Sequence, residues 1–169
     1  MNTLSDLAKY VYYDQDGVVV RNSKQDDVFD LFWRMRKSDI HEIWASHHAT
    51  PKDALKRGFK NSFLCLSILI NNKVIAMFGI STEYLMGERA TIWLLAAPEL
   101  EQIKLRFLKH SRKFVDMFLE YYPILENYVH ANNRASIKWL KFLRAEIDDP
   151  KHYGVENELF HYFKLKRKG

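Results

Sequence analysis

The segment Asn133-Arg134-Ala135-Ser136-Ile137-Lys138-Trp139-Leu140-Lys141-Phe142-Leu143 joins a polar helix start to an apolar stripe. An asparagine side chain can satisfy free backbone N–H groups at a helix start, so Asn132 or Asn133 is expected to cap this helix. Four side chains recur at helical spacing and predict a face that packs on a sheet: Ile137, Trp139, Leu140 and Leu143. The apolar run at residues 125–131 predicts the strand that leads into the helix.

The rest of the chain alternates short apolar runs with amphipathic segments. Further strands are predicted at residues 18–21, 63–70, 73–80, 90–96, 145–148 and 159–166, where apolar, β-branched or aromatic side chains gather. Further helices are predicted at residues 24–35, 39–47, 51–58 and 98–121, where apolar side chains recur at helical spacing. Asn71 and Asn72 predict a tight hairpin turn, because asparagine tolerates positive φ.

This order of elements predicts an α/β (α+β) domain with a central mixed, mostly antiparallel sheet flanked by about four to five helices. A chain of 169 residues suits one domain, 1–169, with residues 1–16 as a candidate N-terminal extension. Its hydrophobic fraction of 47% is ample for a packed core, which excludes global disorder.

The single cysteine points to a reducing compartment, and the net charge bears on possible partners. The net charge of +5 is modest: it fits a nucleic acid, an acidic protein or a phosphorylated cofactor equally well as a partner, and a slightly basic solvated surface explains it most simply. The only cysteine, Cys65, lies in an apolar run and is expected to be buried and inert. The N-terminus shows no signal-peptide pattern, and the longest apolar run, residues 63–70, is too short to span a bilayer. We therefore expect a cytoplasmic protein.

The order of elements and the helix that begins at Asn133 together resemble the GNAT (acyl-CoA N-acyltransferase) superfamily. The resemblance implies a V-shaped splay in the sheet and acetyl-CoA or another acyl-CoA as cofactor. It also implies an amine on a protein or a small molecule as the acyl acceptor.

Residues 90–169 more closely resemble a GNAT-like family, the small internal virion proteins of short-tailed phages. The resemblance rests on Trp93, the basic helix at 104–114, the run at 125–129 and the aromatic strand at 159–163. It implies a phage origin, a location in the host cytoplasm or the virion, and a virion or host protein as partner.

The resemblance also assigns cofactor-binding residues, although one motif departs from the family. In GNAT enzymes the cofactor diphosphate rests on backbone N–H groups of a glycine-containing loop at the start of the long helix. The matching junction, Ala96-Ala97-Pro98-Glu99-Leu100-Glu101, has no glycine and carries two acids, so we expect a degenerate pyrophosphate loop. The assigned contacts are Leu94, Leu95, Ala96, Lys104, Arg106 and Asn133.

Catalytic residues are harder to assign from the resemblance. A base must deprotonate the amine, and the candidates are His130, at the end of a predicted strand, and Glu83. His130 is expected to point into the cleft where two strands splay; the alternative is a hydrogen-bonded histidine at a strand end. Many GNAT enzymes place an acidic tyrosine seven residues after the asparagine, where this chain has Leu140, which cannot donate a proton.

Two other groups of side chains bear on function. The residues His41, Glu42, His47 and His48 match no metal motif, so we expect no metal site. The basic helix at 104–113 and the basic tail lie near aromatic side chains, a pattern that can bind nucleic acid but more commonly marks a solvated face. Two functions stay open: an acyl-CoA-dependent N-acyltransferase, or a non-catalytic virion, morphogenesis or host-interaction protein on the same scaffold.

Overall fold

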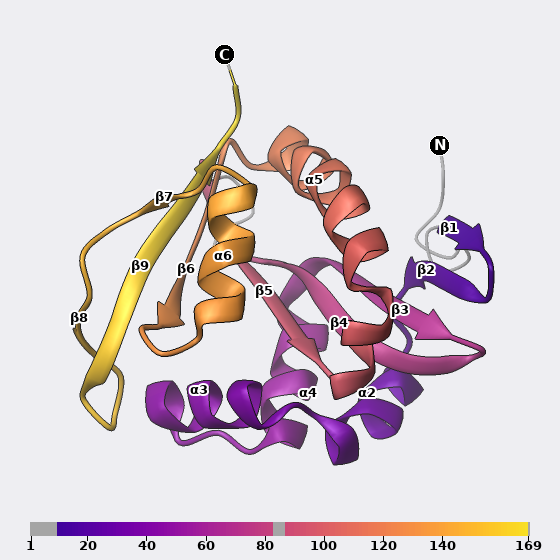
Figure 1. Ribbon diagram of the computed structural model, residues 1–169, viewed down its shortest axis with the longest axis horizontal. Coiled ribbons are helices and arrows are strands. Elements are labelled where there is room, and N and C mark those ends of the chain that lie inside the picture. The colour runs from indigo at the N-terminus through magenta and orange to yellow at the C-terminus, as the bar shows by residue number, and fades with distance from the viewer. Residues whose placement is uncertain (1–9, 83–86, 169) are drawn as a thin grey trace.

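The computed structural model describes residues 10–82 and 87–168 (Figure 1). Within them, nine strands form one sheet in the order β1-β2-β3-β4-β5-β6-β9-β7, and β8 also pairs with β9. The strands are β1 (Val11–Gln15), β2 (Val18–Asn22), β3 (Ser62–Ile70), β4 (Lys73–Ser81), β5 (Arg89–Ala96), β6 (Ile124–His130), β7 (Glu146–Ile147), β8 (Lys151–Tyr153) and β9 (Glu158–Lys166).

Five α-helices and two 3-10 helices flank the sheet in the described residues. They are α2 (Gln25–Leu31), η1 (Phe32–Arg34), α3 (Lys37–His47), α4 (Pro51–Asn61), η2 (Pro98–Ile103), α5 (Lys104–Tyr121) and α6 (Arg134–Phe142). Side chains from α2 and α4 form one buried cluster with β3 and β4, and those from α5 and α6 form another with the sheet. The sheet is therefore covered by helices on both faces.

The pairing of β5 with β6 is parallel, whereas the other strand pairs are antiparallel. It covers the register from Arg89–Ile124 to Thr91–Glu126 and then stops, although both strands continue. Figure 1 shows β6 and β9 turned away from β5, with α6 in front of the opening and α3 below it. The predicted mixed, mostly antiparallel sheet with a V-shaped splay is confirmed.

Helix α6 forms as its sequence predicts. The Asn133 side chain caps it, because Oδ1 accepts a hydrogen bond from the Ser136 N–H at 3.2 Å. Leu140 and Leu143 are buried, and Ile137 and Trp139 pack beside them against the sheet. The β3–β4 turn also follows the prediction, with positive φ at both Asn71 and Asn72.

Three elements differ from the prediction. Strand β1 was not expected, although Asp16-Gly17, with positive φ at both residues, is itself a hairpin signal. The long helix begins as the 3-10 turn η2, with Ala97 as its N-cap residue and Pro98 in its first turn. The segment around His152 was expected to be a loop, but it forms β8. Strand β9 is long enough for both partners, since β8 pairs with its residues 158–160 and β7 with its residues 163–164.

Truncation of Leu125 should destabilise the whole domain, because this side chain is fully buried at the start of β6. We expect Leu125→Ala to lower the free energy of unfolding by about 2–5 kcal/mol. The matched control is Leu105→Ala, whose side chain is 82% exposed and should change stability by less than about 0.5 kcal/mol. Urea denaturation measures both, and equal effects would contradict the described packing.

Candidate active site

A cleft of about 320 Å³ opens between the splayed strands β5 and β6. Side chains from α3 and α4 line one side of it, and Ser136, Trp139 and Leu140 of α6 line another. Trp93 forms part of its wall and is fixed there: its ring packs against Gly58, and its Nε1–H donates to Ser62 Oγ at 2.8 Å. The cleft follows directly from the divergence of the two strands.

The backbone of β5 alternates between the two neighbouring strands. The N–H of Ala97 donates to the carbonyl of Ile75 on the β4 side, so the backbone groups of Leu95 and Trp93 also face β4. Those of Ile92, Leu94 and Ala96 consequently face the opening toward β6.

Most backbone groups that face the opening already have partners. The Ala96 N–H donates to Asp39 Oδ2, and its carbonyl accepts from the Arg36 N–H, each at 2.8 Å. The Ile92 carbonyl accepts from Asn127 Nδ2 at 2.8 Å. Leu94 also lines the cleft, and within residues 10–82 and 87–168 its backbone has no partner on the β6 side, so it can bind a ligand there.

The start of the long helix already holds a carboxylate. Pro98 has no N–H, and the Leu100 N–H donates to the Ala97 carbonyl. The Glu99 carboxylate accepts from its own backbone N–H, from Lys73 Nζ at 3.1 Å and from Arg34 Nη1 at 3.3 Å. These contacts, led by the backbone N–H, lower the pKa of Glu99. The carboxylate of Glu99 thus occupies the N-terminal end of the long helix, which is the end that favours anions.

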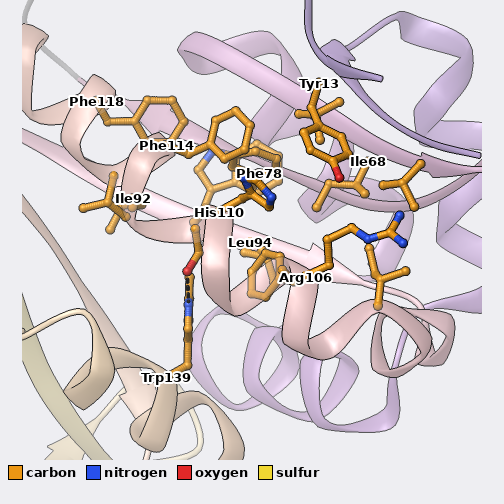
Figure 2. A pocket seen from close by; sticks show the side chains of 17 residues that line it. Tyr13, Ile68, Phe78, Ile92, Leu94, Arg106, His110, Phe114, Phe118 and Trp139 are labelled. Atoms are coloured by element: carbon orange, nitrogen blue, oxygen red, sulfur yellow. Dashed lines mark hydrogen bonds between the residues drawn. The ribbon is translucent and has the colours of Figure 1, made fainter. Parts of the chain in front are cut away.

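The two basic residues assigned to the diphosphate form ion pairs elsewhere. Lys104 Nζ lies 3.3 Å from a carboxylate oxygen of Glu101. Arg106 donates to the Gln15 carbonyl at 3.3 Å and lies 3.7 Å from Asp16, at the β1–β2 turn. Arg106 instead lines a second, apolar cavity of about 50 Å³ between α5 and the sheet, where Figure 2 shows its side chain. Neither Lys104 nor Arg106 lines the cleft.

His130 lies outside the cleft, among the residues that join β6, β9 and α3. Its Nδ1 accepts from the Asn132 N–H at 3.1 Å, so a neutral ring carries its proton on Nε2. That Nε2 lies 2.5 Å from Glu158 Oε2, to which it donates. His41 Nε2 contacts the same oxygen at 2.9 Å, and the hydrogen bonds from His41 and His130 lower the pKa of Glu158.

Nitrogen and oxygen atoms of His41, His130 and Glu158 lie within 4.8 Å of one another, as in a three-ligand metal site. The hydrogen bonds oppose that use. A metal needs the lone pair of His130 Nε2, which would move the ring proton to Nδ1, against the N–H of Asn132. The cluster therefore fits a network of hydrogen bonds better than a metal centre.

Asn133 holds a carboxylate that the sequence did not single out as a site residue. Its Nδ2 donates to Glu42 Oε1 at 3.2 Å, and the same oxygen accepts from the His130 N–H at 2.6 Å. Glu42 belongs to α3 and lines the cleft, where burial raises its pKa against these two hydrogen bonds. With Oδ1 on Ser136, both polar atoms of the Asn133 side chain are engaged.

The assigned residues are therefore only partly brought together. Leu94 and Leu95 line the cleft, whereas the backbone of Ala96 is bonded to α3. Glu83 lies outside the described residues. Asp39 and Glu42 were missed, because nothing in the spacing of α3 reveals that the helix crosses the open end of β5.

Sequence comparison links the chain to a phage family over part of its length. The family model of the bacteriophage T7 probable scaffold protein Gp13 matches residues 68–150, just under half of the chain. This match is consistent with the phage resemblance. No curated protein matches the sequence.

Solved structures match over nearly the whole chain. The ribosomal-protein-S5-alanine acetyltransferase from Vibrio fischeri gives a TM-score of 0.66 at 15% identity, covering 94% of this chain and 97% of that one. The ribosomal-protein-S18-alanine N-acetyltransferase from Escherichia coli gives 0.62 at 16% identity, covering 90% and 96%. The microcin C7 self-immunity acetyltransferase MccE, in complex with acetyl-CoA and AMP, gives 0.67 at 10% identity, covering 90% and 94%.

These structures show that the chain has the GNAT fold, as the resemblance implied. Among the described residues, no helix combines the length and apolar character needed to cross a membrane.

The hydrogen bonds of His130 predict its tautomer and its response to zinc. We expect the neutral ring to carry its proton on Nε2, because the Asn132 N–H occupies Nδ1. Long-range ¹H–¹⁵N NMR identifies the protonated nitrogen, and an equimolar addition of Zn²⁺ should leave the ring signals in place. A proton on Nδ1, or zinc-induced shifts at both His41 and His130, would show instead that a metal binds there.

Proposed function

We propose that this protein is a phage-type, acyl-CoA-dependent N-acyltransferase whose pyrophosphate loop is degenerate. The observation that carries the proposal is the cleft between β5 and β6, with the backbone of Leu94 facing it. An extended acylated pantetheine arm carries amide and carbonyl groups, which can pair with a strand edge of this kind.

Each part of the cleft has a proposed role. An acyl-CoA, when bound, supplies an activated thioester. The Leu94 N–H would donate to the thioester carbonyl and so stabilise the negative charge that develops on its oxygen. Leu95 and Trp93 would hold the arm by packing. The acceptor amine would approach from the side lined by α3 and α4.

The base in this reaction must take a proton from the acceptor amine. His130 and Glu83 are the candidates that the sequence offers, but Glu83 is outside the described residues. His130 uses both ring nitrogens in hydrogen bonds and does not line the cleft. Its backbone N–H donates a hydrogen bond to Glu42, and Glu42 does line the cleft. These contacts therefore support a role for His130 in positioning Glu42 more than a role in direct contact with the substrate.

Acyl-CoA as the cofactor is supported by MccE, whose structure contains acetyl-CoA. The other named acetyltransferases act on alanine in ribosomal proteins by their descriptions, which favours an amine acceptor on a protein or a small molecule. A phage enzyme of this kind would act in the host cytoplasm or be carried in the virion.

A specific observation favours a second candidate, a non-catalytic internal virion, morphogenesis or host-interaction protein. The Glu99 carboxylate occupies the helix start where a diphosphate would bind, and it is held there by Lys73 and Arg34. The family match to a probable scaffold protein supports the same interpretation. On this view the GNAT fold serves as a scaffold, and its cleft has no cofactor.

Ligand binding separates the two candidates. If the cleft binds the acylated arm while Glu99 excludes the diphosphate, acetyl-pantetheine and acetyl-CoA should bind with affinities within about threefold of each other. Both should raise the melting temperature. Removing the charge in Glu99→Gln should tighten acetyl-CoA roughly three- to tenfold and leave acetyl-pantetheine unchanged. Calorimetry measures all four affinities.

Glu101→Gln is the matched control, since Glu101 is largely exposed and pairs with Lys104, so its effect should be smaller. Absence of binding by either ligand at millimolar concentration would contradict the enzyme proposal and favour the scaffold role. Acetyl-CoA binding far more tightly than acetyl-pantetheine would instead show that the loop does hold the diphosphate.

A further inference from the structure

We infer that Glu42 is the general base of this site, the group that takes a proton from the acceptor amine in the cleft. The inference rests on the proposed acyltransferase function. It adds the residue that acts as the base and the charge state of the acceptor that this residue recognises, which is a primary ammonium. It stands on the geometry of α3, β6 and the start of α6.

Glu42 is held at one oxygen and left open at the other. Its Oε1 accepts from the backbone N–H of His130 and from the side chain of Asn133, which belong to the end of β6 and the start of α6. Among the residues that the structure describes, none is hydrogen-bonded to its Oε2. A carboxylate held in this way keeps a fixed orientation and one free oxygen for a donor from the ligand.

Asp39, the other carboxylate that lines the cleft, is fully occupied. Its two oxygens accept from the guanidinium of Arg36, and one of them also accepts from the Ala96 N–H. It is buried and serves to satisfy the end of β5. Of the described carboxylates in the cleft, Glu42 is therefore the one whose free oxygen can meet an amine.

The surroundings favour a base of raised proton affinity. Burial raises the pKa of Glu42, and the negative charge of Asp39 adds to this, while the contacts with His130 and Asn133 lower it. Arg36, Arg57 and His47 also line the cleft, from α3 and α4. A carboxylate with a raised pKa is a stronger base at neutral pH than an ordinary one.

The reaction step balances with an acyl thioester as co-substrate. The acceptor ammonium gives one proton to Glu42 Oε2 and becomes a neutral amine. Its lone pair forms the N–C bond at the thioester carbonyl, and the C–S bond breaks with its electron pair on sulfur. The second nitrogen proton is lost to solvent, the thiolate is protonated from solvent, and Glu42 releases its proton to water.

Asn133 is a positioning residue in this arrangement. Its side chain caps α6 through Oδ1 and holds Glu42 through Nδ2, so one residue ties the helix start to the base. Serine also caps helices well but cannot reach Glu42 with a second group. Asn133→Ser thus keeps a cap at the start of α6 and removes the hydrogen bond to Glu42.

The test compares four proteins with acetyl-CoA and two acceptors, poly-L-lysine and n-butylamine. We expect Glu42→Gln to lower kcat about 100-fold or more and to abolish the fall in rate at acid pH, because the amide cannot take a proton. Acetyl-CoA affinity should stay unchanged, since the amide oxygen can still accept from His130 and Asn133. Asn133→Ser should move the acid limb to higher pH, because Glu42 loses a hydrogen bond that lowers its pKa.

The matched control is Glu146→Gln, an exposed glutamate on β7 that pairs with Lys164 and Lys166, and it should keep the wild-type rate and pH profile. Wild-type transfer with an unchanged rate and pH profile in Glu42→Gln would overturn this inference and leave the proposed function standing. Cofactor binding without transfer by the wild type to either amine would also overturn it. Absence of cofactor binding by the wild type would overturn both.

Discussion

Every feature of the site depends on the loss of pairing between β5 and β6 after Thr91 and Glu126. Two parallel neighbours that diverge leave a row of backbone N–H and C=O groups without a strand partner, and such groups are costly to bury unpaired. In this protein, side chains and the N-terminal turn of α3 supply hydrogen-bond partners for these groups. Asn127 bonds the carbonyl of Ile92 at the vertex, and Asp39 with the backbone of Arg36 closes the far end at Ala96. Between these two points, and counting partners only in the part of the chain that the structure describes, the backbone of Leu94 faces the cleft unpaired.

The same need for partners explains why α3 matters. Its N-terminal turn bonds the end of β5, its middle carries Glu42 to the end of β6, and its last carbonyls accept from the β8–β9 turn at Val155 and Glu156. Gly154 permits this last contact, because a Cβ there would collide with the backbone of Ser46. One helix thus ties the two halves of the splayed sheet together. The carboxylates that it contributes are both structural partners of backbone N–H groups and the polar lining of the cleft.

Local sequence signals predicted much of the fold, since a cap such as Asn133, a turn such as Asn71-Asn72 and the apolar stripe around Leu140 act within a few residues. The site could be predicted only in part. Leu94 and Leu95, which line the cleft, could be assigned because they lie on a strand that the resemblance identifies. His130, Lys104 and Arg106 were assigned by type and position, but their partners, Glu158, Glu101 and Asp16, are decided by packing. Glu42 reaches the cleft through contacts with residues about 90 positions away, which no short-range pattern encodes.

The backbone of Leu94 is proposed to be the unpaired point of the splayed sheet and to bind the acylated arm. Hydrogen exchange at single amides, followed by NMR with and without acetyl-CoA, is the measurement that checks this role. We expect the Leu94 amide to exchange faster than those of Trp93 and Leu95 in the free protein, and saturating acetyl-CoA to slow it selectively. A Leu94 amide already as protected as its neighbours, or one that acetyl-CoA leaves unchanged, would show that this backbone does not bind the arm.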